Sequence, residues 1–202
     1  MTPTVDVCNL ALTHVGQAAT ISAVDPPEGS VYAELCAAMY PLALGALLET
    51  HPWGFATITE QLAPLANTRP GWAHAFAEPA HCLRTWNLSA TADSAPVDFE
   101  RQGAITPASP VVICTNTPTA VVRYTKGTLV PQMLPPLAKV ALSYWLASMI
   151  VGSIVKGQEG ASASAKLLES ARAYALVAAA SDANQSRQMA PPHAVPWVSG
   201  RA

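Results

Sequence analysis

Three short stretches of the sequence bring together side chains that could do chemistry. The first contains Glu49, His51 and Trp53, and a neighbouring carboxylate and imidazole can act as an acid–base pair. No nucleophile motif accompanies these residues. We therefore favour a structural interpretation, in which a helix ends near His51 and Trp53 fills the hydrophobic core.

The second stretch holds residue types that bind metal ions: His74, Glu78, His81 and Cys82. Pro79 lies among them and interrupts any helix, so the spacing of a helical zinc-protease motif is absent. We expect a loop that packs on Trp72, and no metal site.

The third stretch is a pair of carboxylates, Asp98 and Glu100, spaced so that both lie on one face of a strand. Paired carboxylates can cleave glycosidic bonds, but a solvated strand face is the more usual explanation. The sequence also contains no GxSxG, P-loop, GxGxxG or HExxH motif, so we expect neither an enzyme nor a bound cofactor.

Composition indicates a chain that covers much of its surface with partners. Half of the 202 residues are hydrophobic and only 12% are charged, against an average of roughly 25%. The mean hydropathy is +0.25, so either the chain enters a membrane or its apolar surface is occupied by other proteins. The 11 Lys and Arg residues form no cluster and the net charge is -2, which argues against tight nucleic-acid binding but lets DNA slide past.

One segment, residues 137–155, has the length of a membrane-spanning helix and a single charge, Lys139. Pro135 and Pro136 precede it as at a helix start, polar residues recur within it, and no positive cluster flanks it. We favour a buried helix, with a small membrane protein as an alternative.

Residues 1–16 contain no Lys or Arg, so no signal peptide is expected. The cysteines form no CxxC pair, which favours reduced, buried thiols in a cytoplasmic product: Cys8, Cys36, Cys82 and Cys114.

Helical periodicity positions the first stretch. An apolar stripe predicts a helix over residues 4–16, followed by a linker rich in proline and glycine. Ser30 is a good N-cap for a second helix, in which we expect a kink or a break at Pro41. That helix should end at His51, because a residue before proline avoids helical backbone. Its two apolar faces suggest burial on more than one side: Cys36, Tyr40, Ala43 and Leu47, and Leu35, Met39, Leu42 and Ala46.

Between Phe55 and Val130 the hydrophobic period falls toward two and turn residues are frequent, which indicates a small antiparallel sheet or barrel. The candidate strands are 56–62, 82–88, 97–101, 111–115 and 120–124.

The helical spacing of apolar residues resumes at Pro135 and predicts a helix to about Val155, capped by Gly157. We expect the segment QEGASAS to be a loop and a further helix to run from about Ser162 to Ala183. The small residues of this last helix predict a close approach to its neighbour. Its inner stripe should contain Leu167, Ala171, Tyr174, Val177 and Ala178.

These elements predict an α+β, mainly α, fold: a helical bundle with an inserted small antiparallel β domain and an extended C-terminal tail. The helical bundle domain takes residues 1–55 and 131–184, and the β-rich insertion takes residues 56–130. Residues 185–202 hold three prolines and are expected to form an extended C-terminal docking arm.

Four motifs occur in order along nearly the whole chain. A first helix of the form N-x-A-L-x-x-[LV]-G with a following isoleucine is filled by Asn9, Ala11, Leu12, Val15, Gly16 and Ile21. A helix end with a Pro-Trp pair before Phe-Ala is filled by Leu47, Leu48, His51, Pro52, Trp53, Phe55 and Ala56. A W-x-x-A-[FY]-x-x-P-x-[DH]-C-L-R stretch is filled by Trp72, Ala75, Phe76, Pro79, Cys82, Leu83 and Arg84. A strand–turn–strand is filled by Phe99, Glu100, Gly103 and Ile105.

Together these motifs resemble the tail tubular protein A family, the head-to-tail adaptors of short-tailed bacteriophages. The resemblance implies a homo-oligomeric ring, usually dodecameric, between the portal protein and the tail nozzle or tail tube protein, through which DNA passes without specific binding. It implies no cofactor and no membrane, and a place at the head–tail junction of the virion after synthesis in the host bacterial cytoplasm. The alternative function is a virion-associated cell-wall hydrolase that uses Glu49, Asp98 or Glu100.

The C-terminal tail carries the one site that the sequence predicts, a partner-docking cluster of Val195, Pro196, Trp197 and Val198. Tryptophan is a favoured hot-spot residue of interfaces, and the prolines restrict the free chain, so less entropy is lost on docking. A loose terminus is the alternative.

Overall fold

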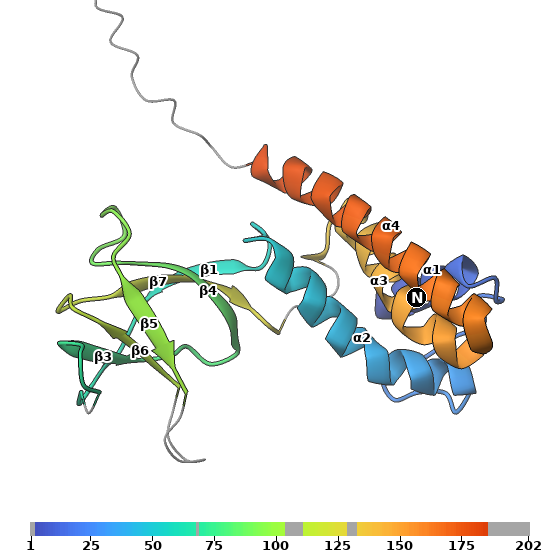
Figure 1. Ribbon diagram of the computed structural model, residues 1–202, viewed down its shortest axis with the longest axis horizontal. Helices are drawn as coiled ribbons and strands as arrows, with labels where there is room; N and C mark the ends of the chain where they lie inside the picture. Colours follow the sequence, from blue (N-terminus) through green and yellow to red (C-terminus); the bar gives the residue numbers. More distant parts are fainter. Residues whose placement is uncertain (1–2, 68, 104–110, 129–132, 186–202) are drawn as a thin grey trace, which may run out of the picture.

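The computed structural model describes residues 3–67, 69–103, 111–128 and 133–185. They form a mixed α+β fold with four helices and two small antiparallel sheets, and about 46% helix. The helices lie at one end of an elongated molecule and the strands at the other (Figure 1). The predicted α+β class is confirmed.

Four helices share one hydrophobic core: α1 (Pro3–His14), α2 (Val31–Thr50), α3 (Pro136–Ile154) and α4 (Gly157–Ala183). α3 contacts each of the other three, which is why its apolar residues are buried on several sides. Residues far apart in the sequence therefore pack together, because the first two helices and the last two are separated by all the strands.

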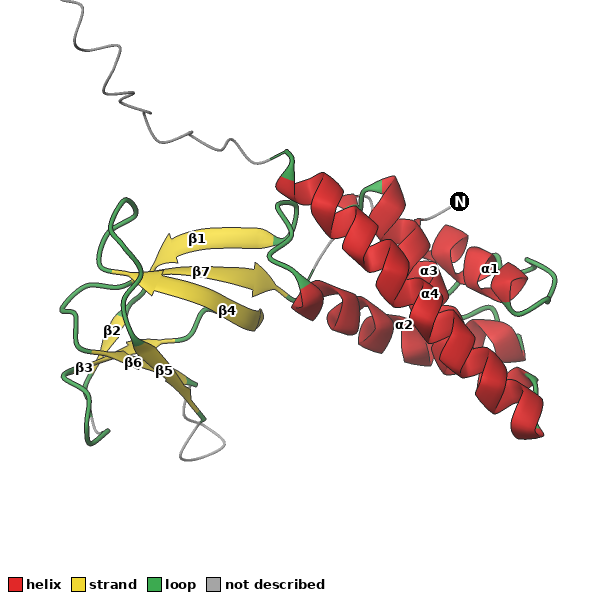
Figure 2. Cartoon of the chain, turned by 45° about the horizontal axis from the view of Figure 1, so that its top comes forward, coloured by secondary structure: helices red, strands yellow, loops and turns green. Residues whose placement is uncertain are grey.

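Seven strands lie between α2 and α3 in the chain: β1 (Thr57–Gln61), β2 (Pro64–Leu65), β3 (His74–Ala77), β4 (Cys82–Ser89), β5 (Phe99–Gln102), β6 (Val112–Thr115) and β7 (Val121–Lys126). They form two antiparallel sheets in the orders β1-β7-β4 and β2-β3-β6-β5, which Figure 2 shows as two layers. Phe76 and Ile113 of one sheet share a buried cluster with Leu88 and Val122 of the other, so apolar faces of the two sheets pack together.

All five candidate strands are present with small changes at their ends, but the sequence analysis missed β2 and β3. The stretch containing His74 was expected to be a loop, and this is wrong. β3 is short and rich in alanine, so its own β-propensity is weak. Its pairing with β6, which places Phe76 opposite Ile113, makes it a strand.

The second helix begins and ends where its sequence predicts. The Ser30 hydroxyl accepts a hydrogen bond from the N–H of Ala33 at 3.2 Å, which satisfies a donor that the first helical turn leaves free. At the other end His51 has extended backbone with φ -151° and ψ 147°. Both end signals are confirmed.

α2 continues through Pro41 to Thr50, so the helix is not broken there; the alternative, a kink at Pro41, stays a prediction. Proline removes one helical N–H and crowds the preceding turn. Pro41 has no N–H to donate to the carbonyl of Ala37. Because the Pro41 side chain is exposed, this part of the helix faces solvent, where water can bond to that carbonyl. The expectation of burial on two sides is also wrong at Leu42, which is 61% exposed.

Pro41→Ala is expected to raise the free energy of unfolding by about 1–2 kcal/mol. The substitution restores the N–H donor to Ala37, and the gain is below the full propensity difference of about 3 kcal/mol because proline also restricts the unfolded chain. Denaturant-induced unfolding measures the change. Equal or lower stability would show that α2 needs the proline at this point.

The last two helices are joined more tightly than expected. Gly157, predicted as a C-cap before a loop, is the first residue of α4, so the segment QEGASAS is helical and the loop prediction is wrong. Gly157 has φ +78°, a conformation that favours glycine and reverses the chain within a few residues. A Cβ at Gly160 would lie 1.9 Å from the carbonyl oxygen of Val155, so only glycine fits there.

The predicted close approach of the last two helices is confirmed by a hydrogen bond between them. The hydroxyl of Ser164 in α4 donates to the carbonyl of Ser148 in α3 at 2.7 Å. The face of α4 turned to α3 is built from small buried residues, which lets the two backbones come close: Gly160, Ala171, Ala175 and Ala178.

Three of the four cysteines, Cys8, Cys36 and Cys114, are buried as expected, whereas Cys82 was expected to be buried and is only partly so; all four are free thiols in the structure. Two helices, α2 and α3, are long and apolar enough to cross a membrane by length and composition. A core helix passes the same test, and 50% of the apolar window of α3 and 39% of that of α2 are buried within the chain. Packing within the chain thus accounts for about half of this apolar window of α3.

Candidate interaction surface

The predicted acid–base group is held in structural contacts. The ion-pair partner of His51 is Asp182 of α4, with 3.6 Å between Nε2 and Oδ2. The His51 ring also makes an edge contact with Trp53, with 5.1 Å between the ring centroids. Glu49 is exposed, and its backbone carbonyl accepts a hydrogen bond from the guanidinium of Arg84.

Of the metal-ligand residue types, Glu78 and Cys82 lie close together: after burial, the neighbouring Glu78 contributes to the raised pKa of the Cys82 thiol. Glu78 forms an ion pair with Arg101, Cys82 contacts the hydroxyl of Thr85 at 3.6 Å, and His74 lies in β3. Within the described part of the chain, no three His, Cys, Asp or Glu residues cluster as metal ligands would.

The two carboxylates of the third stretch differ in their surroundings. Glu100 accepts a hydrogen bond from the indole N–H of Trp72 at 2.8 Å, and this contact lowers the pKa of the Glu100 carboxyl. A general acid in glycoside cleavage needs a raised pKa. Asp98 precedes β5, and its backbone carbonyl accepts from Thr115 at 2.9 Å.

Trp53 is the centre of the junction between helices and strands, as the sequence predicts. It is 1% exposed, and its indole N–H donates to the carbonyl of Leu47 at 3.0 Å. Next to it, the N–H of Gly54 donates to Asp182 at 2.8 Å. The end of α4 is thereby fastened to the segment that joins α2 to β1, a connection that no local sequence signal indicates.

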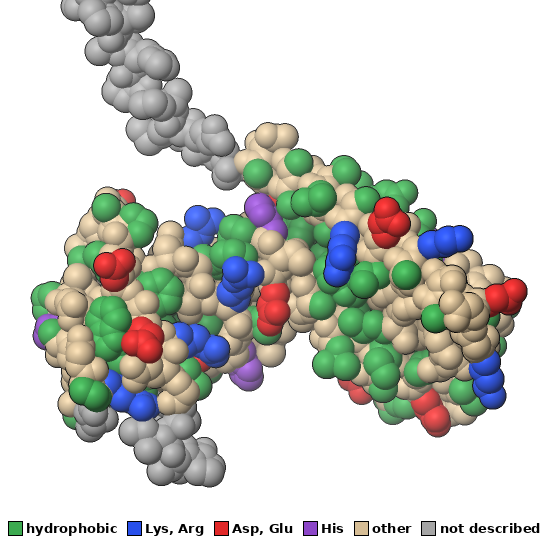
Figure 3. Space-filling model, viewed as in Figure 1, with side chains coloured by type: hydrophobic (Ala, Val, Ile, Leu, Met, Phe, Trp, Pro, Cys, Tyr) green, Lys and Arg blue, Asp and Glu red, His purple; other side chains and the backbone are tan. Residues whose placement is uncertain are grey.

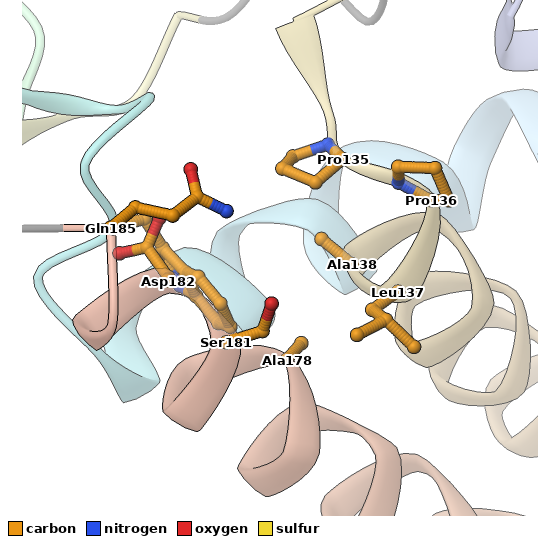
Figure 4. Close-up of a pocket in the computed structure, with 9 residues that line it drawn as sticks. Pro135, Pro136, Leu137, Ala138, Ala178, Ser181, Asp182 and Gln185 are labelled. Carbon is orange, nitrogen blue, oxygen red and sulfur yellow. The ribbon is translucent and has the colours of Figure 1, made fainter.

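A pocket of about 290 Å³ lies at this junction, between the start of α3 and the end of α4. Figure 4 shows Pro135 and Leu137 on one side and Ser181, Asp182 and Gln185 on the other. Trp53 also lines it. The lining mixes apolar side chains with polar ones, among them Ser181 and Asp182, and the Asp182 carboxylate is engaged by Gly54 and His51. Such a mixed lining is suited to binding a ligand.

Three stacked rings join α1, α3 and α4. His14 stacks on Tyr144 with 3.8 Å between centroids, and Tyr144 stacks on Tyr174 at 5.1 Å. His14 also hydrogen-bonds to Ser143 at 3.1 Å. Tyr174 was predicted to lie on the inner stripe of its helix, but it is 38% exposed and sits at the edge of the stack.

The partly buried position of His14 predicts a loss of stability in mild acid. Burial lowers its pKa from the ordinary value of 6.5, so the unfolded chain binds this proton more readily and stability falls as the pH drops below 6.5. Between about pH 7.5 and about pH 5.5, the Tm of the unmodified chain should fall further than that of His14→Phe. Thermal melting by circular dichroism measures this; equal falls in the two proteins would refute the assignment to His14.

The described residues also expose large apolar side chains on two helices. On α2, Val31 is 77% exposed and Leu42 61%; on α4, Leu176 is 73% exposed and Val177 55%. Val177 was predicted to face inward, and this is wrong, because Ala171, Ala175 and Ala178 form the buried face. Hydrophobic side chains are spread over α4 on the face seen in Figure 3.

A groove of about 360 Å³ runs beside this exposed part of α4. We call it the α4 groove. Its wall contains side chains from the end of α2, from α3 and from α4: Thr50, His51, Trp145, Arg172, Ala175, Leu176 and Ala179. No sequence pattern indicated it, because its wall comes from three helices.

The predicted docking residues Val195, Pro196, Trp197 and Val198 lie outside the described residues, as does Ile105 of the fourth motif. No protein-family model matches the chain, and no curated protein matches it. The likeness to tail adaptors therefore rests on the four sequence motifs.

Proposed function

We propose that the chain is a structural subunit of a bacteriophage head-to-tail adaptor, which forms a ring between the portal protein and the tail nozzle or tail tube. In this proposal residues 1–55 and 131–184 are a helical bundle domain and residues 56–130 an inserted β domain. Residues 185–202 are a docking arm. DNA passes through the ring without specific binding, and no metal or cofactor takes part.

The observation that carries the proposal is the exposed apolar surface. A chain with only 12% charged residues leaves Val31, Leu42, Leu176 and Val177 more than half exposed on two helices. Leu176 and Val177 are neighbours on α4, and adjoining exposed apolar side chains are typical of protein–protein contacts. A closed ring needs two different faces on each subunit, and α2 and α4 offer one each.

The places of the motif residues also support a scaffold. The side-chain amide of Asn9 donates to the carbonyl of Ile21 at 2.9 Å and accepts from its N–H at 3.0 Å. Leu12, Leu47 and Trp53 are buried in the same core. The motifs that resemble the adaptor family therefore consist largely of residues that hold the fold together, as expected of a structural subunit.

The hydrolase alternative gains no support from the contacts of its candidate residues. Glu100 has a lowered pKa, which is the wrong direction for a general acid. His51 faces Asp182 and not Glu49.

Assembly is expected to be driven by the portal. Sedimentation of the purified chain should show a monomer, and addition of the portal protein of the same phage should give a complex that electron microscopy shows as a ring.

Leu42→Glu should prevent ring formation because it places a charge in an apolar contact, whereas Glu49→Gln, a change at an exposed polar residue, should leave it unchanged. A chain that associates with portal at no concentration defeats the adaptor proposal, and glycan cleavage that Glu49→Gln abolishes would favour the hydrolase.

A further inference from the structure

The α4 groove has the shape and chemistry of a site for a short apolar segment. The indole of Trp145 and the side chains of Leu176 and Ala179 supply apolar wall, while His51 and Arg172 supply polar groups. A volume of about 360 Å³ falls within the range of small binding sites, roughly 300–1,000 Å³. Leu176 is 73% exposed although it borders this apolar groove.

The chain itself contains a segment of matching chemistry. Residues 195–198 read Val-Pro-Trp-Val and follow Pro191 and Pro192. Proline-rich segments dock in grooves lined by aromatic side chains, and Trp145 supplies such a side chain. The guanidinium of Arg172 could lie against the face of a tryptophan, a favourable cation–π arrangement.

The length of chain beyond α4 allows this segment to reach the groove. The described part of α4 leads to Gln185, and residues 186–194 lie between it and Val195. Nine extended residues span up to about 30 Å. The α4 residues that line the groove, Arg172 to Ala179, lie about 9 to 20 Å back along the helix axis from Gln185.

We infer that residues 195–198 dock in the α4 groove of their own chain, with Trp197 against Trp145 and Leu176. A short linker gives an effective concentration of about 1 mM, which at micromolar protein favours docking within one chain over docking on a second copy. The inference does not depend on the adaptor proposal. If both hold, the free chain keeps its docking arm on its own surface until the portal takes it.

The test uses the full chain labelled with 5-fluorotryptophan and observed by fluorine NMR. The resonance of Trp197 is assigned with Trp197→Phe. A docked Trp197 should give a line as broad as that of Trp145, with a width that does not change on dilution. Leu176→Glu should narrow the line of Trp197 severalfold and shift the line of Trp145. Leu176 is exposed, so the fold should tolerate this change, and Leu176→Ser is a milder second variant.

The matched control is Leu42→Glu, which places the same charge on an exposed leucine outside the groove and should leave the Trp197 line unchanged. A narrow Trp197 line in the unmodified chain overturns the inference, and so does a broad line that neither Leu176 variant changes. A broad line that narrows on dilution shows docking on a second copy and also overturns it. None of these outcomes decides whether the chain binds a portal, so failure of this inference and failure of the adaptor proposal are distinguishable.

Discussion

Replacing Trp53 by alanine is expected to lower the free energy of unfolding by about 3–5 kcal/mol, the usual cost of truncating a buried aromatic side chain. Trp53 is 1% exposed and belongs to the core that all four helices share. Its ring lies 5.5 Å from that of Phe55, and its N–H bonds to Leu47. Alanine would leave a cavity and remove the donor to that carbonyl.

Because Trp53 lies where the helices meet the strands, the loss of stability should affect both the helical part and the β part of the chain. Urea unfolding followed by far-UV circular dichroism measures the total change. Trp53→Phe is the matched control, since it keeps an aromatic ring but loses the hydrogen bond, and should cost less than half as much. A loss below about 1 kcal/mol for Trp53→Ala, as for a surface substitution, would contradict the burial of this side chain.

Local sequence signals predicted both ends of α2, because each end is determined by residues only a few positions away. Ser30 caps the turn that follows it, and Pro52 restricts His51 directly. The prediction at Gly157 was wrong for a related reason. A glycine with positive φ both ends one helix and allows the next to start at once, and the sequence alone does not show which of these occurs.

Side-chain exposure on the helices was harder to predict, because it depends on which neighbours are present. Val177 and Leu42 fit apolar stripes as well as Ala178 and Ala43 do, yet only the two alanines are buried. The core selects small residues on α4 because α3 approaches closely there. The large apolar residues are left outside, where periodicity cannot distinguish a core from an interface.

The contacts that form the candidate site join residues more than a hundred positions apart, and no pattern within one element indicates them. Asp182 reaches Gly54 and His51, and His14 stacks on Tyr144. The same holds for the α4 groove, which needs α2, α3 and α4 together. The docking arm stays a prediction: it rests on a local signal, Trp197 among prolines, in residues outside the described part of the chain.

Replacing Trp197 by alanine is expected to weaken attachment to the portal by about 30-fold or more, because hot-spot tryptophans contribute about 2 kcal/mol or more to an interface. Deletion of residues 190–202 should have at least the same effect. The described helices and strands end before this segment, so neither change should alter the far-UV spectrum or the melting temperature by more than a surface substitution does.

Ser199→Ala is the matched control in the same segment and should bind portal as the unmodified chain does. Surface-bound portal and a titration of each variant give the affinities. If the truncated chain binds with unchanged affinity, residues 195–198 are not the docking site.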